Sequence, residues 1–154
     1  MLIEKVLEWI VEIISINDID YQITGGLAAN LYGSGREVYD IDIEVSDLDV
    51  WRLGFLCEEY IVYGPERYVD EHFDLLLMTL DYGGQLIDVC GIDSMYIRGW
   101  LQLIDFNTSV EINGMKVVLL ADLIAYKKLL NREVDLIDVE LLNKKAGFDK
   151  NPAG

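Results

Sequence analysis

Two acidic residues separated by one residue, Asp40 and Asp42, are the positions in this sequence best suited to chemistry. They open the segment DIDIEV, residues 40–45, in which acidic and apolar residues alternate. Side chains alternate between the two faces of a strand, so a strand here would place its carboxylates on one face and its apolar residues on the other. Carboxylates on one face can bind one divalent cation together. Taken alone, the pattern is more typical of an edge strand whose acidic face lies in water.

A second candidate lies just upstream, where Gly25 and Gly26 stand between a short apolar strand and the segment Leu27 to Tyr32. We expect a strand, a glycine turn and a short helix. The N–H groups that begin a helix favour an anion, and glycine lets a phosphate approach the backbone. A lone glycine pair is more often a plain tight turn. However, two strands joined by one short helix are usually neighbours in a sheet. The glycines would then face the carboxylates, as metal-assisted phosphoryl chemistry requires.

The combined pattern resembles the signature of the DNA polymerase β-like nucleotidyltransferase superfamily. Its parts are Gly25-Gly26, a thirteen-residue gap and then Asp40-Ile41-Asp42-Ile43. The smaller members that it resembles most are the minimal, antitoxin-like and aminoglycoside-modifying nucleotidyltransferases, and the match spans residues 22–45. A weaker match covers residues 119–142, which resemble a helix pair of small members. The residues at the matching positions of that pair are Lys127, Arg132, Asp135 and Asp138.

The resemblance implies a reaction in which a nucleoside monophosphate passes from a nucleoside triphosphate to a small-molecule or protein hydroxyl. Asp40 and Asp42 would bind Mg²⁺ or Mn²⁺. A third carboxylate usually comes from a later strand, binds the metal and assists deprotonation of the acceptor. Asp88, a lone acid in the apolar segment 85–90, is our candidate, with Asp74 in reserve. The alternative for Asp88 is a strand-end acid in solvent.

The nucleotide-binding residues that we expect are Gly25, Gly26, Arg36 and Lys127. Arg36 precedes the acidic strand and could hold phosphate oxygens bidentately; the alternative is an ion pair with Glu37 or a nearby aspartate. Lys127 stands beside Lys128, and two lysines on a helix are more often a solvated face.

Two departures from the family pattern keep a second function open. Val38 stands where many relatives carry threonine, and only about 60 residues follow Asp88, so we expect any added helical domain to be small or absent. The alternative is a non-catalytic domain of the same fold that binds a nucleotide or a partner, such as a toxin–antitoxin component. A homodimer and a protein partner both stay open.

Composition restricts the setting. The 154 residues carry 12 basic and 28 acidic side chains, a formal charge of −16, so we expect no nucleic-acid surface. An apolar content of 52% predicts one folded domain, residues 1–145, followed by a flexible tail, residues 146–154. The sequence contains no run of eighteen apolar residues, so we expect no membrane span. Two cysteines, Cys57 and Cys90, do not make a disulfide framework, so we expect a reducing cytoplasm.

Helical and strand periodicities alternate along the chain, with hairpins between them. We therefore predict an α+β fold, a mixed β-sheet of about five or six strands with helices mainly on one face. The resemblance implies that this sheet is like a nucleotidyltransferase palm. The expected helices cover residues 2–16, 27–32, 47–62, 94–101, 120–130 and 133–145. The expected strands cover residues 21–24, 39–45, 73–80, 85–90, 110–112 and 115–119.

Overall fold

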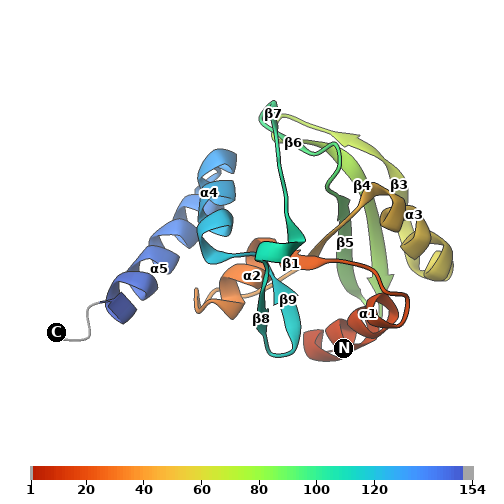
Figure 1. Ribbon diagram of the computed structural model, residues 1–154, viewed down its shortest axis with the longest axis horizontal. Helices are drawn as coiled ribbons and strands as arrows, with labels where there is room; N and C mark the ends of the chain where they lie inside the picture. The colour runs from red at the N-terminus through yellow and green to blue at the C-terminus, as the bar shows by residue number, and fades with distance from the viewer. Residues whose placement is uncertain (1, 151–154) are drawn as a thin grey trace.

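The computed structural model describes residues 2–150, with side chains described for residues 2–146. Figure 1 shows a twisted sheet with helices on both sides. The helices are α1 (Ile3–Ile16), α2 (Gly25–Leu31), α3 (Asp47–Leu56), α4 (Leu120–Leu130) and α5 (Glu133–Lys150). The strands are β1 (Gln22–Thr24), β2 (Ile41–Val45), β3 (Ile61–Val69), β4 (Phe73–Tyr82), β5 (Gln85–Gly91), β6 (Tyr96–Ile97), β7 (Trp100–Leu101), β8 (Val110–Ile112) and β9 (Met115–Val117).

The described strands form one mixed sheet in the order β7-β6-β4-β5-β2-β1-β9-β8, with β3 paired to the free side of β4. The centre of the sheet carries the short strands β1 and β2, which run antiparallel to each other. β2 is parallel to β5, and β1 is parallel to β9. The two strands joined by α2 are therefore neighbours, as the sequence predicted.

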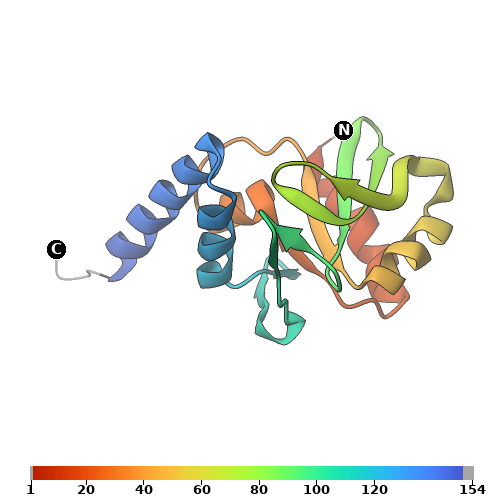
Figure 2. The same ribbon diagram turned by 90° about the horizontal axis from the view of Figure 1, so that it is seen from above.

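The alternation in β2 decides which face of the sheet becomes the core. Ile41, Ile43 and Val45 are fully buried and pack with apolar residues of α1, α2 and α3. Asp42 and Glu44 point to the opposite face and line a cavity there together with residues of α4 and α5. Figures 1 and 2 show α4 and α5 beside the sheet. A second, smaller apolar cluster joins β4, β6 and α4 through Leu75, Ile97 and Leu130. The polar face is thus held between two apolar clusters.

The predicted α+β class is confirmed, and most predicted elements lie within a few residues of the observed ones. The helix expected over residues 47–62 was wrong in its second half, because α3 ends at Leu56 and β3 begins at Ile61. β3 contains Gly64 and Pro65, which argue against a central strand. The structure accommodates them because β3 pairs only with β4, with irregular register between Tyr63 and Glu66.

The helix expected over residues 94–101 was also wrong. This segment is a hairpin, β6–β7, whose two-residue turn holds Arg98 and Gly99 at positive φ. Such turns match the twist of the paired strands. The sheet has nine strands within the described range, more than the five or six expected, because β3, β6 and β7 form where the sequence predicted no strand. α5 continues to Lys150, past the expected start of a tail; residues 151–154 of that tail lie outside the described part of the chain.

In the described part of the chain, no helix combines the length and apolar character needed to cross a membrane.

Ile43 tests how far the buried side of β2 supports the fold. Truncation of Ile43 to alanine removes a fully buried side chain directly behind the acidic face. We expect Ile43→Ala to lower the free energy of unfolding by about 2–5 kcal/mol, measured by urea denaturation. Val62→Ala, at a β3 side chain that is 59% exposed, is the matched control and should cost less than about 1 kcal/mol. Equal losses in the two variants would contradict this assignment of the core.

Candidate active site

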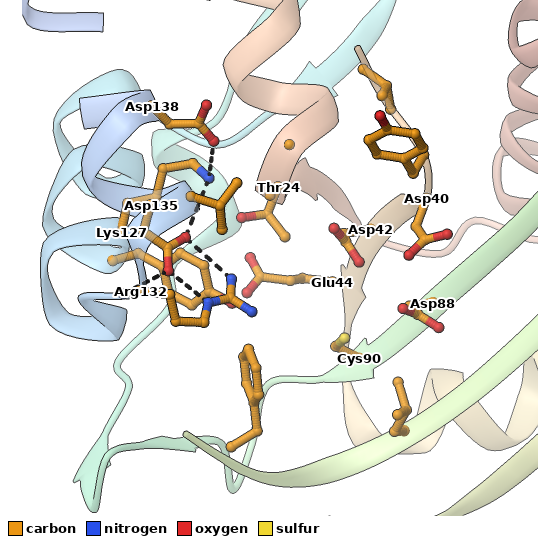
Figure 3. Close-up of a pocket in the computed structure, with 18 of the residues that line it drawn as sticks. Thr24, Asp40, Asp42, Glu44, Asp88, Cys90, Lys127, Arg132, Asp135 and Asp138 are labelled. Carbon is orange, nitrogen blue, oxygen red and sulfur yellow. Dashed lines mark hydrogen bonds and ion pairs between the residues drawn. The ribbon is translucent and has the colours of Figure 1, made fainter. Parts of the chain in front are cut away.

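Three carboxylates meet on the polar face of the sheet. Asp42 of β2 pairs side by side with Asp88 of β5, and Asp40 lies immediately before β2. On the other side of β2, Thr24 at the end of β1 is the register partner of Asp42. Figure 3 shows Asp40, Asp42 and Asp88 together on one side of the pocket. The predicted third carboxylate therefore lies beside the first two, although its role stays a prediction.

Gly25 is packed against Asp42. Its φ is +67°, a conformation that favours glycine, and a Cβ added there would collide with the Asp42 carboxylate. Gly26 has ordinary φ and would meet nothing within 4 Å. Both glycines are the first residues of α2, so the predicted separate turn before the helix is wrong: one glycine bends the chain and the helix starts at once. The glycines and the carboxylates nevertheless share one cavity.

The carboxylates disfavour one another's charge. Burial, followed by the negative charges of Asp88 and Asp40, raises the pKa of Asp42 to about 7. Burial also raises the pKa of Asp88, and the charge of Asp40 adds to that effect. A hydrogen bond from Thr79 Oγ1 to Asp88 Oδ1, 2.7 Å long, opposes this rise and fixes the carboxylate on the sheet. A cation at this position would offset both the cost of burying the charged carboxylates and their mutual repulsion.

The donor set fits a hard divalent cation that takes part of its coordination from a ligand. Among the described residues, no three His, Cys, Asp or Glu side chains are already gathered as a complete metal site. Mg²⁺ commonly uses one or two carboxylates and takes its other oxygen ligands from water and phosphates. Asp42 and Asp88, adjacent on parallel strands, can supply that pair.

A buried network of basic and acidic residues forms the opposite wall (Figure 3). Lys127 of α4 is 3% exposed, and its Nζ lies 2.8 Å from Asp138 Oδ2 and 3.7 Å from Asp135 Oδ1. Arg132 donates to both oxygens of Asp135, at 2.6 and 3.1 Å. The residues that the sequence matched to a helix pair are therefore in mutual contact, and the alternative of a solvated lysine face holds for Lys128 alone.

Arg36 closes this network from the loop before β2. Its guanidinium donates to both carboxylate oxygens of Asp138. Burial alone would raise the pKa of Asp138, but the hydrogen bonds from Arg36 and Lys127 outweigh burial and lower this pKa. The ion pair with an aspartate, which the sequence left open for Arg36, is thus present, and the residue that it finds is Asp138 of α5. Arg36 still borders the cavity and is partly exposed.

One cavity of about 510 Å³ brings the predicted residues together. Its lining includes every residue expected at the site, namely Gly25, Gly26, Arg36, Asp40, Asp42, Asp88 and Lys127. The reserve candidate Asp74 lies elsewhere, where it accepts a 2.6 Å hydrogen bond from Arg67. It is not among the residues that line the cavity, so the geometry favours Asp88.

Several residues beside the site were not expected from the sequence. Thr79 is an isolated hydroxyl in the apolar run of β4, and that isolation was a usable signal. Glu44 is buried, receives a 2.8 Å hydrogen bond from Gln22, and has its pKa raised to about 7 by burial. Tyr126 joins the lining from α4, and burial raises its pKa well above the ordinary value. No local pattern marks the partnership of Gln22 and Glu44, because it depends on the register of β1 and β2.

The two glycines give a paired test of the close approach to Asp42. We expect Gly25→Ala to lower the free energy of unfolding by about 1–3 kcal/mol, since alanine at positive φ is strained and its Cβ must displace a carboxylate. Gly26→Ala meets open space and should leave stability unchanged or slightly higher. Chemical denaturation of both variants measures the difference. A Gly25→Ala protein as stable as the wild type would contradict the close approach of Gly25 to Asp42.

The raised pKa of Asp42 predicts a pH-dependent effect of its removal. Because the folded pKa lies above the unfolded value, the folded state binds this proton more tightly, and its contribution to stability is lost as pH rises from about 4 to 7. At pH 7.5 without divalent cations, Asp42→Asn should therefore be more stable than the wild type by about 4 kcal/mol, since the pKa of Asp42 rises from 3.8 to about 7 and one pKa unit corresponds to about 1.4 kcal/mol. The difference should shrink toward pH 4.5. Thermal unfolding across this range checks it, and an Asn variant that is less stable at pH 7.5 would contradict the repulsion.

Comparisons with known proteins bear on the fold. No family model and no curated protein matches the chain, but solved structures do. A proposed nucleotidyltransferase from Thermotoga maritima is 22% identical, with a TM-score of 0.64 and 96% of each chain covered. The lincosamide antibiotic adenylyltransferase LnuA, solved with lincomycin bound, is 15% identical, with a TM-score of 0.63, over 92% of this chain and 97% of that one. ANT(2″)-Ia, solved with adenylyl-2″-tobramycin, is 16% identical, with a TM-score of 0.56, over 95% of this chain and 90% of that one.

At these identities the likeness concerns the fold. It spans nearly the whole chain, including both the sheet with its carboxylates and the helix pair that carries the basic network. The chain therefore has the fold of these nucleotidyltransferase structures.

Proposed function

We propose that this protein is a nucleotidyltransferase that moves a nucleoside monophosphate from a nucleoside triphosphate to the hydroxyl of a small molecule or a protein, with Mg²⁺ or Mn²⁺ as cofactor. One observation carries the proposal. Asp42 and Asp88 lie side by side at the bottom of a cavity in which Asp42 touches the glycine bend and the far wall is basic. Phosphates and a cation thus have complementary groups within one space.

The cation would be held by Asp42 and Asp88, with Asp40 at the edge of the cavity. When bound, it would offset charge on the triphosphate and lower the pKa of the acceptor hydroxyl. The unfavourable burial of two neighbouring acids in this cavity supports this role, because the same two acids become favourable partners beside a positive charge.

The phosphates would lie between the glycine bend and the basic wall. Gly26 leaves open space above the backbone at the start of α2, where N–H groups are free to meet an anion. Arg36 is held by Asp138 yet partly exposed, so part of its guanidinium can face the cavity. Lys127 is buried behind it and contributes its charge at short range rather than as a mobile side chain.

Asp88 is the residue that would take the acceptor's proton. Burial raises its pKa above that of an ordinary aspartate, which makes it a better proton acceptor near neutral pH. Thr79 donates to Asp88 Oδ1 and so fixes the plane of this carboxylate, which lines the cavity. Orientation of this kind is required of a general base.

The second candidate is a non-catalytic domain of the same fold that binds a nucleotide or a partner protein, including a toxin–antitoxin component. It is favoured by the engagement of Arg36 and Lys127 in an internal network with Asp138, which already satisfies these cations without a phosphate. A homodimer or a protein partner is compatible with either candidate.

Calorimetric titration with ATP, CTP, GTP and UTP, each with and without Mg²⁺, tests the proposal. At least one nucleotide should bind only with the metal. Asp42→Asn should weaken that binding by about 30-fold or more, because losing a contact to a charged group costs about 2 kcal/mol. Asp74→Asn, outside the cavity, is the matched control and should bind like the wild type.

Release of pyrophosphate across a panel of hydroxyl acceptors then separates the two candidates. Metal-dependent binding with turnover supports the enzyme, and metal-dependent binding without turnover supports the binding domain. Binding that ignores both the metal and the Asp42 substitution would place the nucleotide elsewhere and end the proposal.

A further inference from the structure

A second cavity, of about 360 Å³, adjoins the first on the same face of the sheet. Its floor is formed by β1 and β2, and its sides by α4 and the segment of residues 102–108. Thr24, Glu44 and Tyr126 line both cavities and so form the wall between them. The rest of the lining is separate from the carboxylate site, since neither Asp42 nor Asp88 belongs to it.

The floor of this cavity holds an unsatisfied polar atom. Gln22 is 3% exposed, and its amide nitrogen donates to Glu44 Oε1 at 2.8 Å. Gln22 Oε1 has no partner, and it is the one buried side-chain nitrogen or oxygen in the described part of the chain of which this is true. An unpaired buried acceptor costs about 1–3 kcal/mol, so its presence needs an explanation such as a bound donor.

The charges around this atom specify the kind of donor. Glu44 on the floor, Asp105 on the side and Asp122 in the first turn of α4 all line the cavity, and no Lys, Arg or His does so. Asp105 already accepts from the backbone N–H of Asn107, whereas Asp122 is exposed at the surface. Phosphate and carboxylate ligands would be repelled here. A ligand with a positively charged N–H group would be attracted and could supply the donor that Gln22 Oε1 lacks.

We propose that this second cavity binds a small organic ammonium ion, with the ammonium group donating to Gln22 Oε1 and lying against Glu44. Leu103, Ile104, Val118 and Leu129 add apolar lining, which suits a short carbon chain behind the charged group. A bound ammonium would share the wall of Thr24, Glu44 and Tyr126 with whatever fills the first cavity. That an acceptor hydroxyl could enter in this way rests on the proposed function, whereas the binding itself does not.

Titration of the ¹⁵N-labelled wild-type protein with 1-aminobutane, followed by NMR, tests the proposal without nucleotide or metal. The side-chain amide signals of Gln22 should shift and saturate with the amine. The neutral analogue 1-butanol and the anion butyrate should leave them unmoved. Because neither nucleotide nor Mg²⁺ is present, failure here leaves the nucleotidyl transfer proposal standing, and failure of nucleotide binding leaves this one standing.

Two variants locate the site. Gln22→Met keeps the side-chain length but removes both the acceptor and the amide donor to Glu44, and it should weaken amine binding about tenfold. Glu111→Gln removes an exposed acid on β8 outside the cavity and should bind like the wild type, which controls for diffuse attraction to a chain of charge −16. If Gln22→Met does not fold, the wild-type amide shifts still decide. The proposal is overturned by an absence of saturable shifts at Gln22, by equal shifts with butanol, or by equal binding in wild-type and Gln22→Met proteins.

Discussion

Repulsion between acids that the fold forces together is the constraint on which this structure depends. Asp42 and Asp88 are neighbours across two parallel strands, and Asp40 lies two positions before Asp42. Burial strengthens the repulsion among these carboxylates. Nothing in the packing of the apolar face requires this arrangement, since Ile41, Ile43 and Val45 would form the same core with neutral residues opposite. The acids therefore lower the stability of the protein when no cation offsets their charge, and such a cost is expected at a functional site rather than in a purely structural one.

In the polar wall that faces these acids, by contrast, positive and negative side chains are paired. Lys127 and Arg132 are matched to Asp135 and Asp138, so that charges buried between α4 and α5 are compensated there. A buried ion pair contributes little net stability but a large penalty when one member is lost. Complementary charges thus hold α4 and α5 together, whereas the acids on the sheet opposite have no positive partner in contact among the described residues. A ligand that is anionic at one end and carries a cation at the other suits such a gap.

Much of the fold could be predicted from local patterns. The alternation of residues 40–45, the Asn113-Gly114 turn and the helical period of residues 120–130 all gave elements that the structure contains. The errors fell where tertiary context overrides local preference. Gly64 and Pro65 break a helix or a central strand, but an edge strand with one partner tolerates them. The hairpin at residues 94–101 depends on two residues with positive φ, one of which, Arg98, carries no sequence signal for that conformation.

At the site, the motifs predicted residues that the fold brings together in one cavity. The partners Thr79, Gln22 and Asp138 could not be predicted, because register and helix docking determine them.

The bond between Arg36 and Asp138 joins residues 102 positions apart in the chain. The loop before β2 is therefore held in part by α5, a helix that is translated well after the loop itself. During translation, at about 5–20 residues per second, the carboxylates and the glycine bend can assemble with β1 and β2 while the basic wall is still missing. A nascent chain at that stage would present its acids without Lys127 and Arg132 opposite them, so the two walls of the cavity come together only after α4 and α5 have been translated.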